Sequence, residues 1–178
     1  MNGGMELYLH MPFCVRKCAY CDFLSFPTDQ ETQNLYTRRL REDIDAMGKK
    51  YGDIPVDTIF IGGGTPSVPD SALIVGIMEH VRKAFHVAEG AEISMEANPG
   101  TVTREKLTDY RRAGINRLSF GLQSANDREL KLLGRIHTWA EFLESFHLAR
   151  ECGFTNINID LMSALPGQTR ESWKATLK

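Results

Sequence analysis

Three cysteines near the N-terminus offer the most distinctive chemistry in this 178-residue sequence. Cys14, Cys18 and Cys21 form a C-x3-C-x2-C run directly after a short apolar stretch at residues 7–11. Cysteine thiolates are the ligands of iron–sulfur clusters, and a four-iron cluster held by only three of them leaves one iron without a protein ligand. Such an iron can bind and activate a small molecule. The spacing therefore predicts a three-cysteine metal centre.

A structural zinc site and a redox pair are the alternative interpretations of these cysteines. A zinc site normally uses four ligands in two separated pairs, and Cys152 is the only other cysteine in the sequence. A disulfide framework is disfavoured because the sequence shows no secretory leader, residues 1–4 being only a short leader of another kind. Cys152 stands beside Gly153 and is expected to be a small buried apolar residue rather than a fourth ligand.

The composition is typical of a globular cytoplasmic protein. Hydrophobic residues make up 42% and charged residues 25% of the sequence, and the formal net charge is −2. This near-neutral charge gives no support for nucleic-acid binding, and no apolar run is long enough for a transmembrane segment. No linker or low-complexity segment divides the chain, so we expect one domain over residues 1–178.

Short β-rich runs alternate with helical patterns, which predicts an α/β fold with a parallel sheet. Five such units follow one another, with strands expected at residues 6–10, 58–61, 92–96, 117–120 and 157–162. Apolar residues at helical spacing predict helices between them. Thr138 and Glu141 form a capping box that begins one of these helices, and Gly153 ends it. A last helix is expected to begin near Arg170.

The last expected strand is apolar, and the sequence stops soon after it. A parallel strand of this kind requires a neighbour on each side, because an open edge exposes unpaired backbone groups. We therefore expect the domain to be incomplete at its C-terminus, with a sixth strand missing.

Polar residues lie where the expected strands end, which is where active sites lie in folds of this kind. A run of three glycines at residues 62–64 follows the second strand. Such a run can be a tight turn, or it can let the backbone offer amides or carbonyls to a ligand. Glu96 and Gln123 follow the third and fourth strands, where each could also be a solvated end residue.

Two charged residues extend this pattern. Asp160 stands between Ile159 and Leu161 in the fifth strand, where a carboxylate needs a partner such as the hydroxyls of a ribose. Arg135 could neutralise a carboxylate through a two-pronged contact, although an exposed arginine after a helix is common.

Taken together, these residues resemble the radical S-adenosylmethionine (SAM) superfamily, whose cluster motif is C-x3-C-x2-C. Further segments resemble the group that contains oxygen-independent coproporphyrinogen III oxidase and the heme chaperones of the HemW type. They are YLHMPFC at 8–14, GGGTPS at 62–67, EANPG at 96–100, LSFGLQS at 118–124, GRIH at 134–137 and LPGQT at 165–169. The resemblance implies a partial (β/α)6 barrel that binds a [4Fe-4S] cluster on Cys14, Cys18 and Cys21, with SAM on the fourth iron.

The resemblance also implies which residues contact SAM. They are Tyr8, Tyr20, Gly63, Gly64, Thr65, Glu96, Gln123, Arg135 and Asp160. Some of these could serve a second SAM, which the oxidase binds. His137 belongs to the same set of motifs, but a histidine at a helix boundary is more often a cap or a packing residue.

The two residues after Cys21 favour one branch of the group. In the oxidase the third cysteine is followed by Gly-Cys, whereas here it is followed by Asp22 and Phe23, as in the chaperones. The first hypothesis is thus a heme-binding and heme-transfer protein that uses the cluster and SAM. The second is a radical enzyme acting on a porphyrinogen or another substrate. The third is an inactive fragment that still binds a metal.

The resemblance implies partners as well. A radical SAM protein receives an electron from a donor such as a flavodoxin or ferredoxin, and a chaperone passes heme to an acceptor protein. The heme-related residues of the chaperones lie largely in a carboxyl-terminal region that this sequence does not contain. No heme ligand is therefore assigned.

Overall fold

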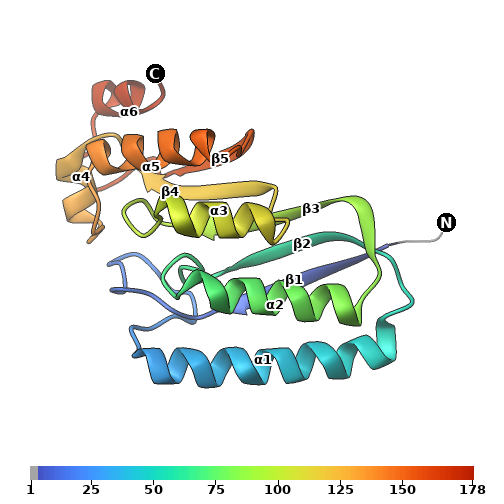
Figure 1. The fold of residues 1–178 in the computed structure, drawn as a ribbon. Coiled ribbons are helices and arrows are strands. Elements are labelled where there is room, and N and C mark those ends of the chain that lie inside the picture. Colours follow the sequence, from blue (N-terminus) through green and yellow to red (C-terminus); the bar gives the residue numbers. More distant parts are fainter. Residues whose placement is uncertain (1–3) are drawn as a thin grey trace.

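A computed structural model describes residues 4–178 of the chain. Residues 1–3 of the expected leader lie outside the described residues. The elements are β1 (Met5–Met11), α1 (Gln30–Tyr51), β2 (Val56–Gly63), α2 (Ser71–Ala84), β3 (Val87–Ala97), α3 (Arg104–Arg112), β4 (Arg117–Gln123), α4 (Asp127–Leu132), α5 (Trp139–Glu151), β5 (Asn156–Leu161) and α6 (Arg170–Thr176) (Figure 1). All five expected strands and the helices between them are confirmed.

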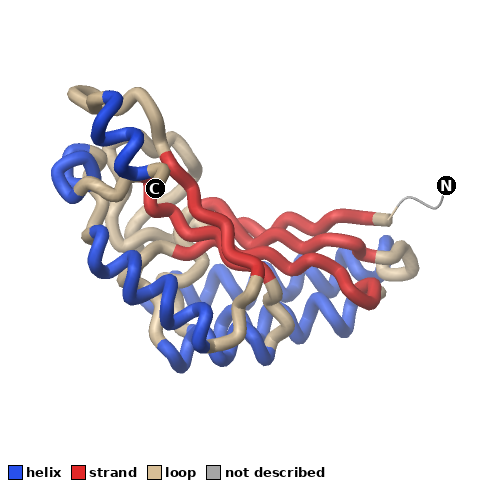
Figure 2. The backbone as a smooth tube through the Cα atoms, turned by 90° about the horizontal axis from the view of Figure 1, so that it is seen from above, coloured by secondary structure: helices blue, strands red, loops and turns tan. Residues whose placement is uncertain are grey.

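The five strands form one parallel sheet in the order β1-β2-β3-β4-β5. The sheet is bowed, and α1, α2, α3 and α5 lie along one side of it (Figure 2). Strands in chain order with helices on one side wind in a single direction, as in a barrel, whereas a doubly wound sheet reverses its order. The expected barrel-type α/β fold is therefore confirmed for the described residues.

The strands have one apolar and one polar face, because successive side chains point to opposite sides of a sheet. In β3 and β4, Met95 and Phe120 are fully buried on the helix side. Glu96 pairs in register with Ser119 on the opposite face. In β5, Asp160 shares this open face, because it lies in register with Gly121 two residues beyond Ser119. The open face thus carries the polar groups.

The third strand is longer than expected. It begins at Val87, which pairs with Val56 of β2, and the register shifts before Thr58 pairs with Glu92. Gly90 takes a φ of +80° in this irregular stretch, a conformation that glycine adopts without strain.

The helix expected between Thr138 and Gly153 and the last helix, expected near Arg170, begin as expected. Thr138 and Glu141 form the reciprocal hydrogen bonds of a capping box at the start of α5. Gly114 and Gly153 take positive φ values of +90° and +88° just beyond α3 and α5. Trp139 stacks on Phe142, with ring centroids 5.3 Å apart.

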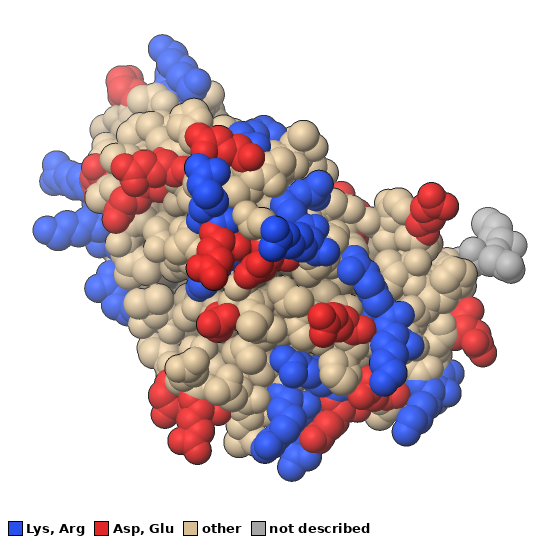
Figure 3. Space-filling model, viewed as in Figure 1, with Lys and Arg blue, Asp and Glu red and all other residues tan. Residues whose placement is uncertain are grey.

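The surface carries charges of both signs. On the face shown in Figure 3, Lys and Arg side chains are interspersed with Asp and Glu side chains. Across residues 4–178, no helix combines the length and the hydropathy needed to cross a membrane.

The helix-side core predicts the effect of one matched pair of substitutions. Leu107 of α3 is fully buried, whereas Leu35 of α1 is 48% exposed. Leu107→Ala leaves a cavity and should lower the free energy of unfolding by about 2–5 kcal/mol, whereas Leu35→Ala should change it by about 0.5 kcal/mol or less. Urea denaturation of the two variants tests this, and equal effects would contradict the assignment of the core.

Candidate functional site

A cavity of about 420 Å³ opens at the carboxyl ends of the strands and gathers the predicted residues. Every predicted site residue except Tyr8 lines it: Cys14, Cys18, Tyr20, Cys21, Gly63, Gly64, Thr65, Glu96, Gln123, Arg135 and Asp160. These residues come from β2 to β5, from the loops after β1 and β2, and from the loop after α4. The cavity is thus the place where the strand ends converge.

Tyr8 lies in β1, in register with Phe60 of β2, and does not line the cavity. Its ring stacks on Phe60 with centroids 6.1 Å apart, and its hydroxyl lies 3.2 Å from Nδ1 of His10. Tyr8 is 59% exposed. Its contact with SAM therefore stays a prediction.

The cysteine-bearing loop is fixed at both ends. Phe13, directly before Cys14, is 1% exposed and packs edge-on against Tyr36 of α1, with ring centroids 5.3 Å apart. The Cys14 amide donates to the Phe26 carbonyl at 3.1 Å. Farther along, the Ala19 amide donates to the Leu133 carbonyl at 3.1 Å. The segment that carries the thiols is therefore held by hydrogen bonds, to Phe26 near its start and to Leu133 at the end of α4.

The glycine run packs against the start of this loop. The amides of Gly64 and Thr65 donate to the carbonyls of Met11 and Phe13 at 2.8 and 2.6 Å, and the Gly63 amide donates to Glu96 Oε2 at 2.9 Å. These three amides thus bond to the protein itself, and the contact of Gly63, Gly64 and Thr65 with a ligand stays a prediction. A Cβ on Gly64 would lie 2.6 Å from the Phe13 oxygen, so the glycine permits the close contact.

Two of the thiols have hydrogen-bonding neighbours. Cys14 Sγ lies 3.7 Å from the Thr65 hydroxyl, and Cys18 Sγ lies 3.6 Å from Nη1 of Arg135. Nη2 of Arg135 donates to Asn98 and to the Gly121 carbonyl. Its two terminal nitrogens thus face acceptors of the protein, and Nε is buried without a partner among the described residues.

Two carboxylates complete the cavity. Burial raises the pKa of Glu96, and the hydrogen bond from the Gly63 amide partly opposes this shift. Asp160 accepts hydrogen bonds from the Ser119 hydroxyl at 3.1 Å and from the side-chain amide of Asn158 at 2.7 Å. The partner that Asp160 was expected to need is therefore supplied within the sheet.

Gln123 ends β4 in the left-handed region, with a φ of +74°. A non-glycine residue there is uncommon and costs about 1 kcal/mol or more. The register between β4 and β5 shifts at this point, and the side chain is largely buried at the cavity wall.

Asn98 and Ser119 also line the cavity, and residue types and spacing did not predict a role for either. A signal for Ser119 existed, since it is the polar residue between the apolar Leu118 and Phe120 in a strand. Asn98 stands two positions after Glu96 and so belongs to the same side of the chain. Their hydrogen-bond partners come from other elements, which the spacing of residues does not reveal.

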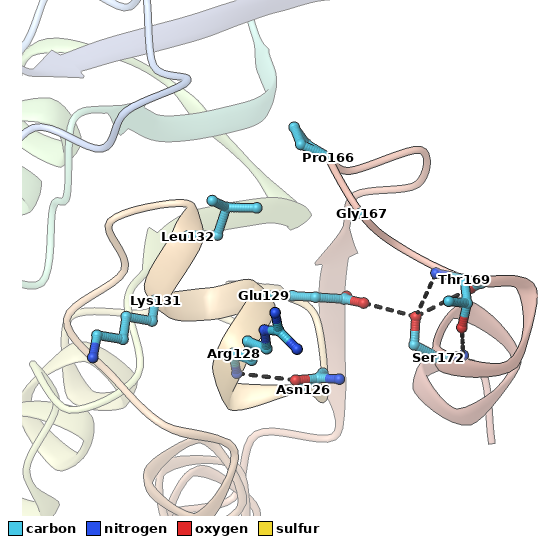
Figure 4. A pocket seen from close by; sticks show the side chains of 9 residues that line it. All are labelled: Asn126, Arg128, Glu129, Lys131, Leu132, Pro166, Gly167, Thr169 and Ser172. Atoms are coloured by element: carbon cyan, nitrogen blue, oxygen red, sulfur yellow. Dashed lines mark hydrogen bonds between the residues drawn. The ribbon is translucent and has the colours of Figure 1, made fainter.

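A second hollow, of about 550 Å³, lies between α4 and the segment from Pro166 to α6 (Figure 4). Glu129 of α4 points across it and accepts a hydrogen bond from the Ser172 hydroxyl at 2.7 Å. The same carboxylate accepts from Ser124 at 2.6 Å and from Gln168 at 3.0 Å. These bonds fix α6 to α4, and none of the predicted site residues lines this hollow.

Comparison with protein families matches residues 8–178 to the radical SAM superfamily. The chain therefore belongs to that superfamily. Among curated proteins it is similar to heme chaperone HemW of Escherichia coli strain K12, with 43% identity over 94% of this chain and 44% of that protein. Heme chaperone HemW of Bacillus subtilis strain 168 is 39% identical over 91% of this chain and 43% of that protein.

A solved structure of a radical SAM enzyme is also similar to this chain. The radical SAM enzyme coproporphyrinogen III oxidase (HemN) of Escherichia coli superposes with a TM-score of 0.91 and 34% identity, over 99% of this chain and 41% of that one. The chain thus spans less than half the length of these relatives.

The residues present fit the iron–sulfur cluster and SAM that the superfamily implies. The donor set is three thiols in one cavity, with a guanidinium and a hydroxyl beside two of them. No three His, Cys, Asp or Glu side chains among residues 4–178 converge as they would on a single metal ion. A cluster of several irons needs its ligands farther apart, since each binds a different iron.

Cys152 and His137 do not line the cavity. Cys152 ends α5, beyond the cavity, and its Sγ lies 4.0 Å from the Thr108 hydroxyl and 3.8 Å from the Arg104 carbonyl. Cys152 was expected to be a small buried residue, and it packs against the core but is only partly buried. His137 is 4% exposed and precedes the N-cap of α5, which confirms the packing interpretation.

His137 makes the stability of the chain depend on pH. Burial, together with the nearby Arg135 guanidinium, lowers the pKa of His137 to about 4. The unfolded chain binds a proton near pH 6.5, whereas the folded chain does not, so stability should fall as the pH drops from about 6.5 toward 4. We expect His137→Gln to remove roughly 1–2 kcal/mol of this loss between pH 7 and pH 5.

Urea denaturation of the unsubstituted chain and of His137→Gln, each at pH 7 and pH 5, measures the difference in free energy of unfolding. The effects of other titrating groups cancel when the two proteins are compared. His147→Gln is the control, because His147 lies in α5 but is exposed. An equal pH dependence in the unsubstituted chain and in His137→Gln would contradict the assignment.

Proposed function

We propose that this chain forms the cluster- and SAM-binding core of a heme chaperone-like radical SAM protein. The observation that carries the proposal is the cavity in which Cys14, Cys18 and Cys21 meet the glycine run and two carboxylates. The similarity of this chain to curated heme chaperones, over 94% of its length, supports the chaperone branch within the superfamily.

The cysteines would hold a [4Fe-4S] cluster, which supplies an electron to SAM when both are bound. Arg135 and Thr65 would donate hydrogen bonds to the cluster thiolates. Asp160, already oriented by Ser119, would accept from the ribose hydroxyls, since a carboxylate can accept from two donors. Tyr8, Tyr20, Gly63, Gly64, Glu96 and Gln123 are the further SAM contacts that we propose.

The residue at position 23 favours the chaperone over the oxidase. Phe23 lines the cavity, and its side chain is 69% exposed at the mouth. It stands where the oxidase has a cysteine, so this chain presents an apolar ring in place of a thiol. The second candidate, an oxidase acting on coproporphyrinogen, is supported by the close superposition on HemN.

We further propose that residues 1–178 act as one radical SAM core domain and that heme binding needs residues beyond those of this sequence. The electron would come from a carrier such as a flavodoxin or ferredoxin, and heme would pass to an acceptor protein. The composition of the sequence favours a cytoplasmic location.

Anaerobic reconstitution with iron and sulfide tests the proposed cluster. We expect about four irons per chain and an EPR signal of the reduced protein that changes when SAM is added. Cys14→Ala should lose most of the iron, because the loop then offers two thiolates. Cys152→Ala is the matched control and should bind as much iron as the unsubstituted chain, since Cys152 lies outside the cavity. Equal iron loss in both variants, or a signal indifferent to SAM, would refute the proposal.

Product analysis separates the chaperone from the oxidase. The reconstituted chain, SAM, a reductant and coproporphyrinogen III are incubated together, and 5′-deoxyadenosine is measured. The chaperone proposal predicts no 5′-deoxyadenosine formed in step with loss of the porphyrinogen. 5′-Deoxyadenosine formed in proportion to the porphyrinogen consumed would instead establish the oxidase.

A further inference from the structure

A line of hydrogen bonds links two of the three cysteines through one asparagine. Asn98, in the loop after β3, lies between Thr65 and Arg135: its Nδ2 is 2.9 Å from Thr65 Oγ1, and its Oδ1 is 2.5 Å from Arg135 Nη2. Thr65 continues to Cys14 Sγ at 3.7 Å, and Arg135 continues to Cys18 Sγ at 3.6 Å. Three loops from different parts of the chain thus meet at one amide.

The chemistry of the side chains fixes the direction of each bond. Arginine has donors and no acceptor, so the oxygen of the Asn98 amide must face Arg135 and its nitrogen must face Thr65. The Thr65 oxygen therefore accepts from Asn98, which leaves its own proton to be donated elsewhere. A cysteine thiolate that binds iron can only accept. Both ends of the line consequently donate to sulfur.

The backbone of Asn98 is held in place independently of its side chain. Its amide donates to the Ser67 hydroxyl at 3.2 Å, and its carbonyl accepts from the Thr101 hydroxyl at 2.7 Å. Ser67 is fully buried, and the Ser67 and Thr101 hydroxyls lie 2.6 Å apart. Removal of the Asn98 side chain therefore leaves these backbone bonds intact.

We propose that Asn98 is a positioning residue that raises the reduction potential of the cluster, by holding Thr65 and Arg135 so that each donates a hydrogen bond to a cluster thiolate. This inference rests on the proposed function, because it requires a cluster on the three cysteines. Hydrogen bonds to ligand sulfur stabilise the more negative, reduced state of a cluster. Bonds in a line also polarise one another, so Asn98 strengthens the donation by Thr65.

An EPR-monitored redox titration of reconstituted protein, without SAM, tests the proposal. At the midpoint potential of the unsubstituted chain, Asn98→Ala should lower the ratio of reduced to oxidised cluster about tenfold, a shift of about 59 mV to more negative potential. Thr65→Val keeps the shape and removes one donor, so its shift should have the same sign and be smaller. The double variant should shift by less than the sum, since Asn98 acts partly through Thr65.

Asn116→Ala is the matched control. Asn116 is also a half-buried asparagine, and it bonds to the middle of β3, accepting from the Ile93 amide at 2.9 Å and donating to the Ala91 carbonyl at 2.8 Å. Its loss should lower the melting temperature of the cluster-free chain without moving the potential.

Four outcomes overturn the inference. An unchanged potential in Asn98→Ala, or an equal shift in Asn116→Ala, would show that the asparagine acts only on stability. If Asn98→Ala takes up no cluster, Thr65→Val decides, and an unchanged potential there rejects the inference. If the unsubstituted chain takes up no cluster, the proposed function fails first and the inference fails with it.

Discussion

The close contact between the glycine run at the end of β2 and the residues before Cys14 is the constraint on which the rest of the site depends. Two backbone hydrogen bonds, from Gly64 to Met11 and from Thr65 to Phe13, join the second strand's loop to the start of the cysteine loop. A side chain at Gly64 would overlap the Phe13 oxygen. Phe13 is in turn buried against α1, so the first thiol is placed by the core of the fold. The same contact brings the Thr65 hydroxyl to the Cys14 sulfur.

Within residues 4–178, helices cover one face of the sheet, and the other face supplies the remaining groups of the site (Figure 2). The apolar residues of each strand pack on the helices, and the residues between them are free to be polar. Glu96 and Asp160 reach the cavity from this open face, and Arg135 brings a positive charge to it from the loop after α4. Glu96 is partly buried and Asp160 is exposed. Glu96 accepts a hydrogen bond from Gly63, and Asp160 accepts hydrogen bonds from Ser119 and Asn158. The alternation of apolar and polar residues along the strands thus forms both the core and one wall of the cavity.

Much of this arrangement could be predicted from the sequence, because periodic patterns identify strands and helices, and the carboxyl ends of parallel strands meet at one edge. Eleven of the twelve predicted site residues line a single cavity for this reason. The bonds between elements could not be predicted. The amides of the glycine run serve the protein itself, and Asn98 and Ser119 gain their significance only from side chains far away in the sequence. Register and side-chain distance decide these features, and neither is visible in residue spacing.

The central claim is that three cysteines of this chain hold a four-iron cluster with one iron open to SAM. Mössbauer spectroscopy of protein reconstituted with ⁵⁷Fe, recorded with and without SAM, tests it most directly, since it reports on each iron of the cluster. The account predicts that about one quarter of the iron signal changes when SAM is added, while the rest keeps the parameters of sulfur-ligated iron. A spectrum in which SAM changes no iron, or in which all irons are equivalent and fully ligated by the protein, would contradict it.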